Sequence, residues 1–215
     1  MKSLVIFDLD GTLVNTIEDL ANATDHALTE LGFPTHAVPS YRNMVGNGVT
    51  KLLERALPEE ARSTRMIEAM RTHFREYYDN HLYDLSTPYT GIPELLRELT
   101  DRGIACAVAS NKYQSAVERI IAHFFPTTPW VAVFGHNEGV PVKPDPSIVF
   151  EILAKHPTPK ADVLYVGDSN VDIETARRAC VDGCGVTWGF RGRQELVAAC
   201  APHIVSSPDD ILSLL

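Results

Sequence analysis

The stretch LVIFDLDGTL, residues Leu4–Leu13, decides how this chain is interpreted. Its four apolar residues are typical of a buried strand, and Asp8 and Asp10 follow directly. Side chains alternate between the two faces of a strand, so these two carboxylates share a face if the chain stays extended. They repel each other unless a cation or a shared proton relieves them. Gly11 permits a tight turn; for this motif alone, an ordinary Asp- and Gly-rich turn is the alternative.

The composition is that of a soluble globular protein, with 215 residues, 45% apolar and 22% charged. A net charge of −9 argues against a nucleic-acid partner, because nucleic-acid surfaces carry a basic stripe. No apolar stretch approaches the roughly 20 residues of a membrane span, and no signal peptide precedes the first strand. We therefore expect a cytoplasmic protein whose four cysteines are free thiols. The oligomeric state is left open.

Apolar runs rich in Val and Ile alternate with helical patterns over most of the chain. The expected strands are residues 4–7, 104–109, 131–134, 163–166, 185–188 and 203–205. The expected helices between them are residues 91–101, 113–124, 146–155, 170–181 and 193–199. This alternation predicts an α/β fold with a mostly parallel sheet that helices cover on both faces.

Residues 15–83 break the alternation because they show helical patterns only. The expected helices run over residues 17–31, 49–57 and 66–78. A helical stretch of this size between the first two strands predicts an inserted all-helical domain. The sheet domain would then consist of residues 1–14 and 84–215. The chain is expected to leave and rejoin it near residues 14–16 and 82–88.

Polar residues also follow the second expected strand and fill a later loop. In Ser110–Lys112, a Ser and an Asn can donate hydrogen bonds to an anion, backed by the N-terminus of the next helix. In Lys143–Pro146, two prolines stiffen the loop and fix where the Lys143 ammonium points. Such an ammonium can neutralise a phosphoryl oxygen or a carboxylate. Taken singly, either segment could be an ordinary helix start.

The sequence GDSNVD, residues 167–172, ends another expected strand with an acid. Asp172 lies one helical turn after Asp168, so one carboxylate can bind a metal ion while the other orients it. The carboxyl ends of parallel strands meet at one crevice, where we expect all these polar groups to converge. Hard oxygen ligands favour Mg²⁺. A carboxylate that attacks phosphorus forms an aspartyl-phosphate.

With these four motifs in this order, the chain resembles the haloacid dehalogenase superfamily of phosphohydrolases. Within it, the chain is similar to the phosphoglycolate phosphatase-like group, over essentially its whole length. The resemblance implies a Rossmann-like three-layer core with a helical cap formed by residues 15–83. It also implies that Asp8 is the nucleophile and a Mg²⁺ ligand. Asp10 would be the general acid/base, with its backbone carbonyl on the metal.

The same resemblance assigns roles to the later motifs. Ser110 and Lys143 would hold the phosphoryl group, with Asn111 beside it. Asp168 would bind Mg²⁺, and Asp172 would support the metal site without binding the ion directly. We also expect the hydroxyl and the backbone N–H of Thr12 to take part in binding the substrate.

Two features of residues 15–83 bear on specificity. Val45–Gly48, with the sequence VGNG, resembles the cap loop of phosphoglycolate phosphatases. Its glycines would let backbone amides approach an anionic leaving group, so Gly46 and Asn47 are expected to bind substrate. A plain turn between helices is the alternative. Asn15 stands where the family usually has Asp, which we expect to affect specificity rather than chemistry.

The expected function is a Mg²⁺-dependent phosphatase that hydrolyses a small phosphorylated metabolite through an aspartyl-phosphate, with 2-phosphoglycolate the leading candidate. The acid at Asp10 favours phosphoryl transfer, because the dehalogenases that the chain resembles lack an acid there. A sugar-phosphate mutase like β-phosphoglucomutase, or a pyrophosphatase, would share all four motifs. A non-catalytic binding protein on the same scaffold is the alternative from another class, but every motif acid is present.

Overall fold

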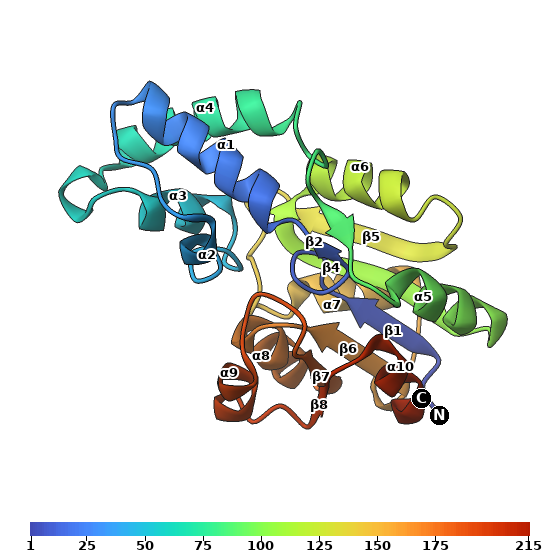
Figure 1. Ribbon diagram of the computed structural model, residues 1–215. Coiled ribbons are helices and arrows are strands. Elements are labelled where there is room, and N and C mark those ends of the chain that lie inside the picture. Colours follow the sequence, from blue (N-terminus) through green and yellow to red (C-terminus); the bar gives the residue numbers. More distant parts are fainter.

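The computed structural model describes residues 1–215, and its centre is a six-stranded sheet with a helical lobe beside it (Figure 1). The strands are β1 (Leu4–Phe7), β4 (Ala105–Tyr113), β5 (Trp130–His136), β6 (Val163–Gly167), β7 (Asp182–Val186) and β8 (His203–Val205). Their order is β5-β4-β1-β6-β7-β8, and every pairing is parallel. The predicted α/β fold with a mostly parallel sheet is confirmed.

Both faces of the sheet are covered by helices, which explains why β1 is apolar throughout. Val5 and Phe7 belong to one apolar cluster, and Leu4 and Ile6 to a second one. Residues of α5 (Ile92–Asp101), α6 (Gln114–Phe124) and α10 (Pro208–Ile211) enter the first cluster, and residues of α7 (Ser147–Lys155) and α8 (Asn170–Ala179) the second. The short helices α9 (Arg193–Ala198), η2 (Lys160–Asp162) and η3 (Leu212–Leu214) complete this part of the chain. Successive side chains of a strand point to opposite faces of the sheet. Because both faces of this parallel sheet are buried, all of these side chains in β1 are apolar.

The last part of β4 differs from the prediction. We expected the strand to end at residue 109, but it continues to Tyr113, which pairs with His136 of β5 after a shift in register. Ser110–Lys112 therefore lies in extended chain, and α6 begins only at Gln114. The helix expected from residue 113 begins one residue later, at Gln114. Extended backbone, and not the first turn of this helix, carries the side chains of Ser110 and Asn111.

The strand expected at residues 185–188 is also misplaced, because β7 spans Asp182–Val186. Its sequence, DGCGV, contains two glycines, and glycine weakens the sequence signal of a strand. At Gly185 the fold needs a small residue, since a Cβ atom there would lie 2.8 Å from Leu196 of α9. The other predicted helices and strands end within two residues of those observed.

The helical lobe consists of the chain between two short strands. We call α1 (Ile17–Glu30), α2 (Val38–Tyr41), α3 (Val49–Ala56), η1 (Glu59–Ala61) and α4 (Thr64–Tyr78) the helical insert. It leaves the sheet through β2 (Val14–Asn15) and returns through β3 (Thr87–Pro88), and these two strands pair antiparallel. Asn15 thus lies opposite Thr87, where the insert joins the sheet. The helices α2 and η1 were not predicted, and the domain limits at residues 15 and 83 stay a prediction.

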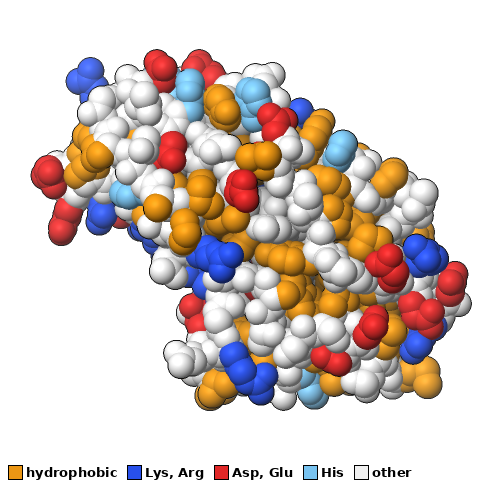
Figure 2. Space-filling model, viewed as in Figure 1, with side chains coloured by type: hydrophobic (Ala, Val, Ile, Leu, Met, Phe, Trp, Pro, Cys, Tyr) orange, Lys and Arg blue, Asp and Glu red, His pale blue; other side chains and the backbone are white.

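A buried carboxylate ties the insert to the returning chain. Asp19 of α1 accepts hydrogen bonds from the backbone N–H groups of Leu85 (3.0 Å) and Ser86 (2.8 Å) and from the Ser86 hydroxyl (2.6 Å). Figure 2 shows the insert as a lobe at the upper left, with charged side chains along its outer edge. No helix of the chain is both long enough and apolar enough to cross a membrane.

Candidate active site

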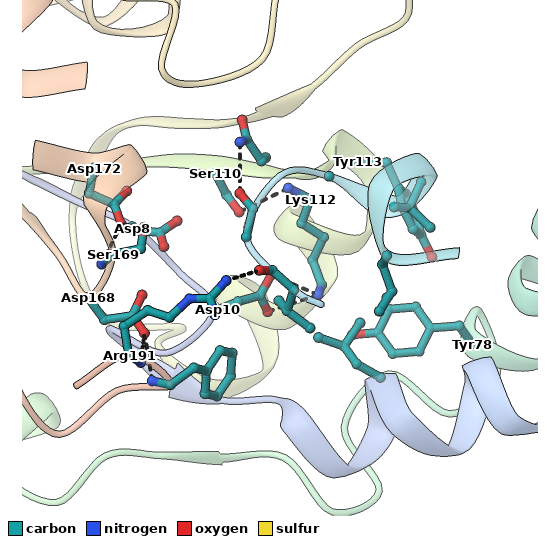
Figure 3. A pocket seen from close by; sticks show the side chains of 18 of the residues that line it. Asp8, Asp10, Tyr78, Ser110, Lys112, Tyr113, Asp168, Ser169, Asp172 and Arg191 are labelled. Atoms are coloured by element: carbon teal, nitrogen blue, oxygen red, sulfur yellow. Dashed lines mark hydrogen bonds and ion pairs between the residues drawn. The ribbon is translucent and has the colours of Figure 1, made fainter. Parts of the chain in front are cut away.

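A cavity of about 50 Å³ lies where the insert meets the carboxyl ends of β1, β4 and β6 (Figure 3). β1 lies between β4 and β6, so the strands that follow it along the chain lie on both of its sides. Open α/β sheets bind their ligands at such a switch point. The polar side chains that line it are Asp8, Asp10, Tyr78, Ser110, Asn111, Lys112, Tyr113, Asp168, Ser169, Asp172 and Arg191. The cavity therefore combines three of the four sequence motifs with residues of the insert.

Three buried acids form a cluster at one end of the cavity. Oxygen atoms of Asp8, Asp168 and Asp172 lie within 4.8 Å of one another. Lys143 supplies the compensating charge: its Nζ lies 2.8 Å from Asp8 Oδ1 and 2.7 Å from Asp172 Oδ1. It also donates to the Ala109 carbonyl at 3.0 Å. One buried ammonium thus compensates a cluster of three carboxylates.

This surplus of negative charge is visible in the pKa values. Burial raises the pKa of Asp8 to about 7, with Lys143 opposing and Asp172 adding to the rise. Burial and the charges of Asp172 and Asp8 raise the pKa of Asp168 well above its usual range. Burial would lower the pKa of Lys143, but Asp172 and Asp8 outweigh burial and raise it well above the usual value. The cluster is therefore short of positive charge, as expected of a cation site.

The free oxygen atoms of the cluster indicate how it could hold a metal ion. Asp168 Oδ2 accepts from the backbone N–H of Phe190 at 2.6 Å, and Asp8 Oδ1 accepts from Lys143, so each residue keeps one oxygen without a hydrogen bond. Both oxygens of Asp172 are taken, by Lys143 and by Ser169. Asp8 and Asp168 thus fit as metal ligands, and Asp172 fits as the residue that positions Lys143.

Asp10 lies between this cluster and the insert (Figure 3). It accepts a hydrogen bond from the Thr16 hydroxyl at 2.6 Å and pairs with Lys112, whose Nζ lies 2.9 and 3.0 Å from its two oxygens. Lys112 was not predicted to have a role in the site. Its position two residues after Ser110 in extended chain could have indicated it, because both side chains then share a face.

Asn111 joins three parts of the site. Its carboxamide nitrogen donates to the carbonyls of Gly46 (3.0 Å) and Lys143 (3.1 Å), and its oxygen accepts from the Lys143 backbone N–H (2.8 Å). Both of its N–H groups are therefore used within the protein. Asn111 thus holds the Lys143 loop and the Gly46 loop together, and its place beside the phosphoryl group stays a prediction. Ser110 lines the cavity, and its hydroxyl oxygen accepts from the Lys112 backbone N–H.

The chain matches the model of the haloacid dehalogenase-like hydrolase family over residues 5–186. It belongs to this family. It is 35% identical to a phosphoglycolate phosphatase of Vibrio cholerae, over 100% of this chain and 97% of the relative. It is 31% identical to one of Vibrio parahaemolyticus, over 99% and 95%. A crystal structure of a predicted phosphoglycolate phosphatase from Haemophilus somnus shares the fold with a TM-score of 0.91 at 28% identity, covering 99% and 97% of the two chains.

The resemblance to haloacid dehalogenase-like hydrolases is thereby confirmed, and the structure adds detail to several expected residues. Gly46 lies at the cavity wall. Asn47 does not line the cavity, and its side-chain oxygen accepts from Arg55 within the insert at 2.8 Å. Thr12 is fully buried outside the cavity lining, and its backbone N–H donates to the Leu9 carbonyl. Substrate binding by Asn47 and Thr12 stays a prediction.

Arg191 is a further residue of this hydrolase site that the sequence analysis did not single out. It follows β7, and its guanidinium donates to the Asn43 side chain (3.0 Å) and to the Val45 carbonyl (2.9 Å) of the insert. Its backbone N–H donates to Asp168 at 3.3 Å. Arg191 therefore connects the acid cluster with the insert loop that contains Gly46.

Proposed function

We propose that this haloacid dehalogenase-like hydrolase is a Mg²⁺-dependent phosphatase that cleaves a small phosphate monoester, 2-phosphoglycolate, through an aspartyl-phosphate on Asp8. The observation that carries the proposal is the setting of Asp8. One of its oxygens is held by Lys143, and the other is free inside the acid cluster at the end of the cavity that Asp10 also lines. The names of the two Vibrio relatives support the substrate.

In the proposed mechanism, a carboxylate oxygen of Asp8 attacks phosphorus in line with the ester oxygen. The bond between phosphorus and the ester oxygen breaks, and Asp10 gives a proton to the departing alkoxide. Asp10 then removes a proton from the water that hydrolyses the aspartyl-phosphate, which releases inorganic phosphate and restores Asp8. Lys143 holds Asp8 in place and offsets part of the negative charge that gathers around the phosphoryl group.

The acid cluster fits the metal that this family implies, because it offers two free carboxylate oxygens and too little positive charge. Asp8, Asp168 and the backbone carbonyl of Asp10 would hold Mg²⁺. When bound, the ion would neutralise charge on the phosphoryl oxygens.

We further propose that the helical insert, within residues 15–83, serves as a cap over the sheet domain formed by residues 1–14 and 84–215. Residues from both parts line the cavity, and its volume of about 50 Å³ leaves room for only a few water-sized groups. A closed cap of this kind excludes bulk water during phosphoryl transfer. The small volume also favours a small leaving group.

Phosphate release with Mg²⁺ is the direct test. We expect rapid release from 2-phosphoglycolate and slower release from β-glucose 1-phosphate and from pyrophosphate. Chelation of the metal with EDTA is expected to stop the reaction, and added Mg²⁺ to restore it. Chromatography of the products separates the alternatives: an isomerised sugar phosphate without free phosphate would contradict a phosphatase and indicate a mutase.

The metal site predicts an effect on stability that is independent of turnover. In the native protein, Mg²⁺ at about a hundred times its dissociation constant is expected to raise the melting temperature by about 5–10 °C. In Asp168→Asn the carboxamide oxygen can still accept from Phe190, and one buried charge is removed. We therefore expect an unchanged or higher melting temperature in EDTA and no rise with Mg²⁺. Differential scanning calorimetry measures both quantities.

Asp101→Asn is the matched control for this experiment, because Asp101 is exposed at the end of α5. It is expected to keep the full response to Mg²⁺. A full response in Asp168→Asn as well would remove Asp168 from the metal site.

A further inference from the structure

We propose that Lys112 and Tyr78 form a subsite for a carboxylate on the leaving group. This subsite would make the enzyme selective for monoesters that carry a carboxylate one carbon away from the ester oxygen. The inference rests on the proposed function, because it places the leaving group beside Asp10. It goes beyond that function by assigning recognition of the substrate to two residues, one from the sheet domain and one from the insert.

The hydroxyl of Tyr78 is the first observation. Tyr78 is the last residue of α4; it is fully buried and lines the cavity, yet its hydroxyl has no hydrogen-bond partner. Tyr113, on the same cavity wall, shows the usual arrangement, because its hydroxyl donates to Asp79 at 2.6 Å. Buried polar groups without a partner are rare and costly. The unused hydroxyl of Tyr78 therefore points to a ligand acceptor.

Lys112 is the second observation. Its side chain is only 4% exposed, and its Nζ lies 5.0 Å from the centre of the Tyr78 ring. Two of its three N–H groups donate to the oxygens of Asp10, and no other acceptor contacts the Lys112 ammonium. Figure 3 shows the Tyr78 side chain near the end of Lys112. The Lys112 ammonium thus lies over the ring that carries the unpartnered hydroxyl, and donors on two neighbouring side chains suit an anion with two oxygens.

The distance from the reacting atoms limits which anion can use these donors. An ester oxygen that takes a proton from Asp10 lies within hydrogen-bond distance of that carboxylate, as Lys112 Nζ does. Two hydrogen bonds of ordinary length place the ester oxygen within about 6 Å of Nζ. A carboxylate on the adjacent carbon spans this gap and leaves its oxygens near Lys112. A longer leaving group would carry its anion past the subsite.

The charges around the subsite favour a singly charged group over a second phosphate. Lys112 already shares its charge with Asp10, whose carboxylate lies 2.9 Å from its Nζ. Arg191 lines the cavity, but its guanidinium is used by Asn43 and Val45 of the insert. A single, partly compensated ammonium matches one carboxylate.

Two substrates of equal reach test the subsite: 2-phosphoglycolate, and 2-hydroxyethyl phosphate, in which a neutral hydroxymethyl group replaces the carboxylate. We expect the native enzyme to prefer the first. Tyr78→Phe is expected to reduce the ratio of the two kcat/KM values by roughly five- to tenfold, mainly through the KM for 2-phosphoglycolate. Lys112→Met should reduce it by roughly ten- to a hundredfold. In Tyr113→Phe, the matched control, the ratio should not change.

An unchanged ratio in Tyr78→Phe, or a native enzyme that does not distinguish the two substrates, would overturn the subsite while the phosphatase stands. Phosphate release from neither substrate would instead refute the proposed function. Glycolate alone then tests the subsite: it should raise the melting temperature of the native protein, and this rise should be lost in Tyr78→Phe. Absence of any rise in the native protein would overturn the inference. Because Tyr78→Phe removes only an unpartnered hydroxyl, the variant without ligand should melt no lower than the native protein.

Discussion

Replacement of Asp8 by asparagine is expected to reduce Mg²⁺-dependent phosphate release by about 10⁴-fold or more. A carboxamide cannot attack phosphorus, so the aspartyl-phosphate does not form. The shape of the side chain is kept, and its oxygen can still accept from Lys143, which lies 2.8 Å from Asp8 Oδ1. The measurement is a steady-state assay of phosphate release, with mass spectrometry of acid-quenched protein to detect the phosphorylated residue.

The fold of this variant is expected to survive, because Asp8→Asn removes one of three clustered negative charges. Its melting temperature in EDTA should therefore be at least that of the native protein. Asp101→Asn, at an exposed position, serves as the control with native activity. Activity that persists in Asp8→Asn together with a phosphorylated protein would move the nucleophile to another residue.

Lys143→Met is expected to damage both activity and stability. The Lys143 ammonium is 2% exposed and pairs with Asp8 and Asp172, so its loss leaves three buried carboxylates without a compensating charge. Removal of one partner from a buried ion pair costs about 3–5 kcal/mol of the free energy of unfolding. Urea denaturation in EDTA measures this loss. Phosphate release should also fall steeply, because Asp8 loses the group that holds it.

A double variant separates these two effects. In Lys143→Met with Asp172→Asn, one of the unpaired charges is gone. The new carboxamide can still accept a hydrogen bond from Ser169, which donates to Asp172 in the native protein. We expect part of the stability to return but none of the activity. A single variant that is as stable as the native protein would show that Lys143 does not balance the acid cluster.

The core of the fold was predictable because the sheet is buried on both faces. Runs such as Leu4–Phe7 are then apolar at every position and are easily recognised between helical patterns. The prediction of β7 was misplaced because close packing against Leu196 requires a glycine at position 185, and glycine weakens the sequence signal of a strand. The end of β4 was missed because Ser110–Lys112 is polar, although its backbone remains extended beside β5.

The site was predictable only to the extent that residues follow strands in sequence. Asp8 and Asp168 directly follow β1 and β6, and parallel strands bring their carboxyl ends together. Tyr78 and Arg191 could not be assigned in this way. They meet the cavity through the packing of the insert against the sheet, and Arg191 bonds to Val45, which lies far away along the chain. The pairing of Lys112 with Asp10, 102 residues apart, depends on the register of β1 and β4.

The pairing of β2 with β3 also matters for how the chain folds. β1 and β4 are neighbours in the sheet, yet about a hundred residues separate Leu4 from its partner Ala105. Once Asn15 and Thr87 are paired, the insert no longer counts toward this loop, which shrinks to about thirty residues. The entropy cost of closing a loop grows with the logarithm of its length, so the shortcut saves about 1 kcal/mol. The β2–β3 pair thus shortens the loop that separates β1 from β4. When β2 and β3 pair first, the pairing of β1 with β4 is faster.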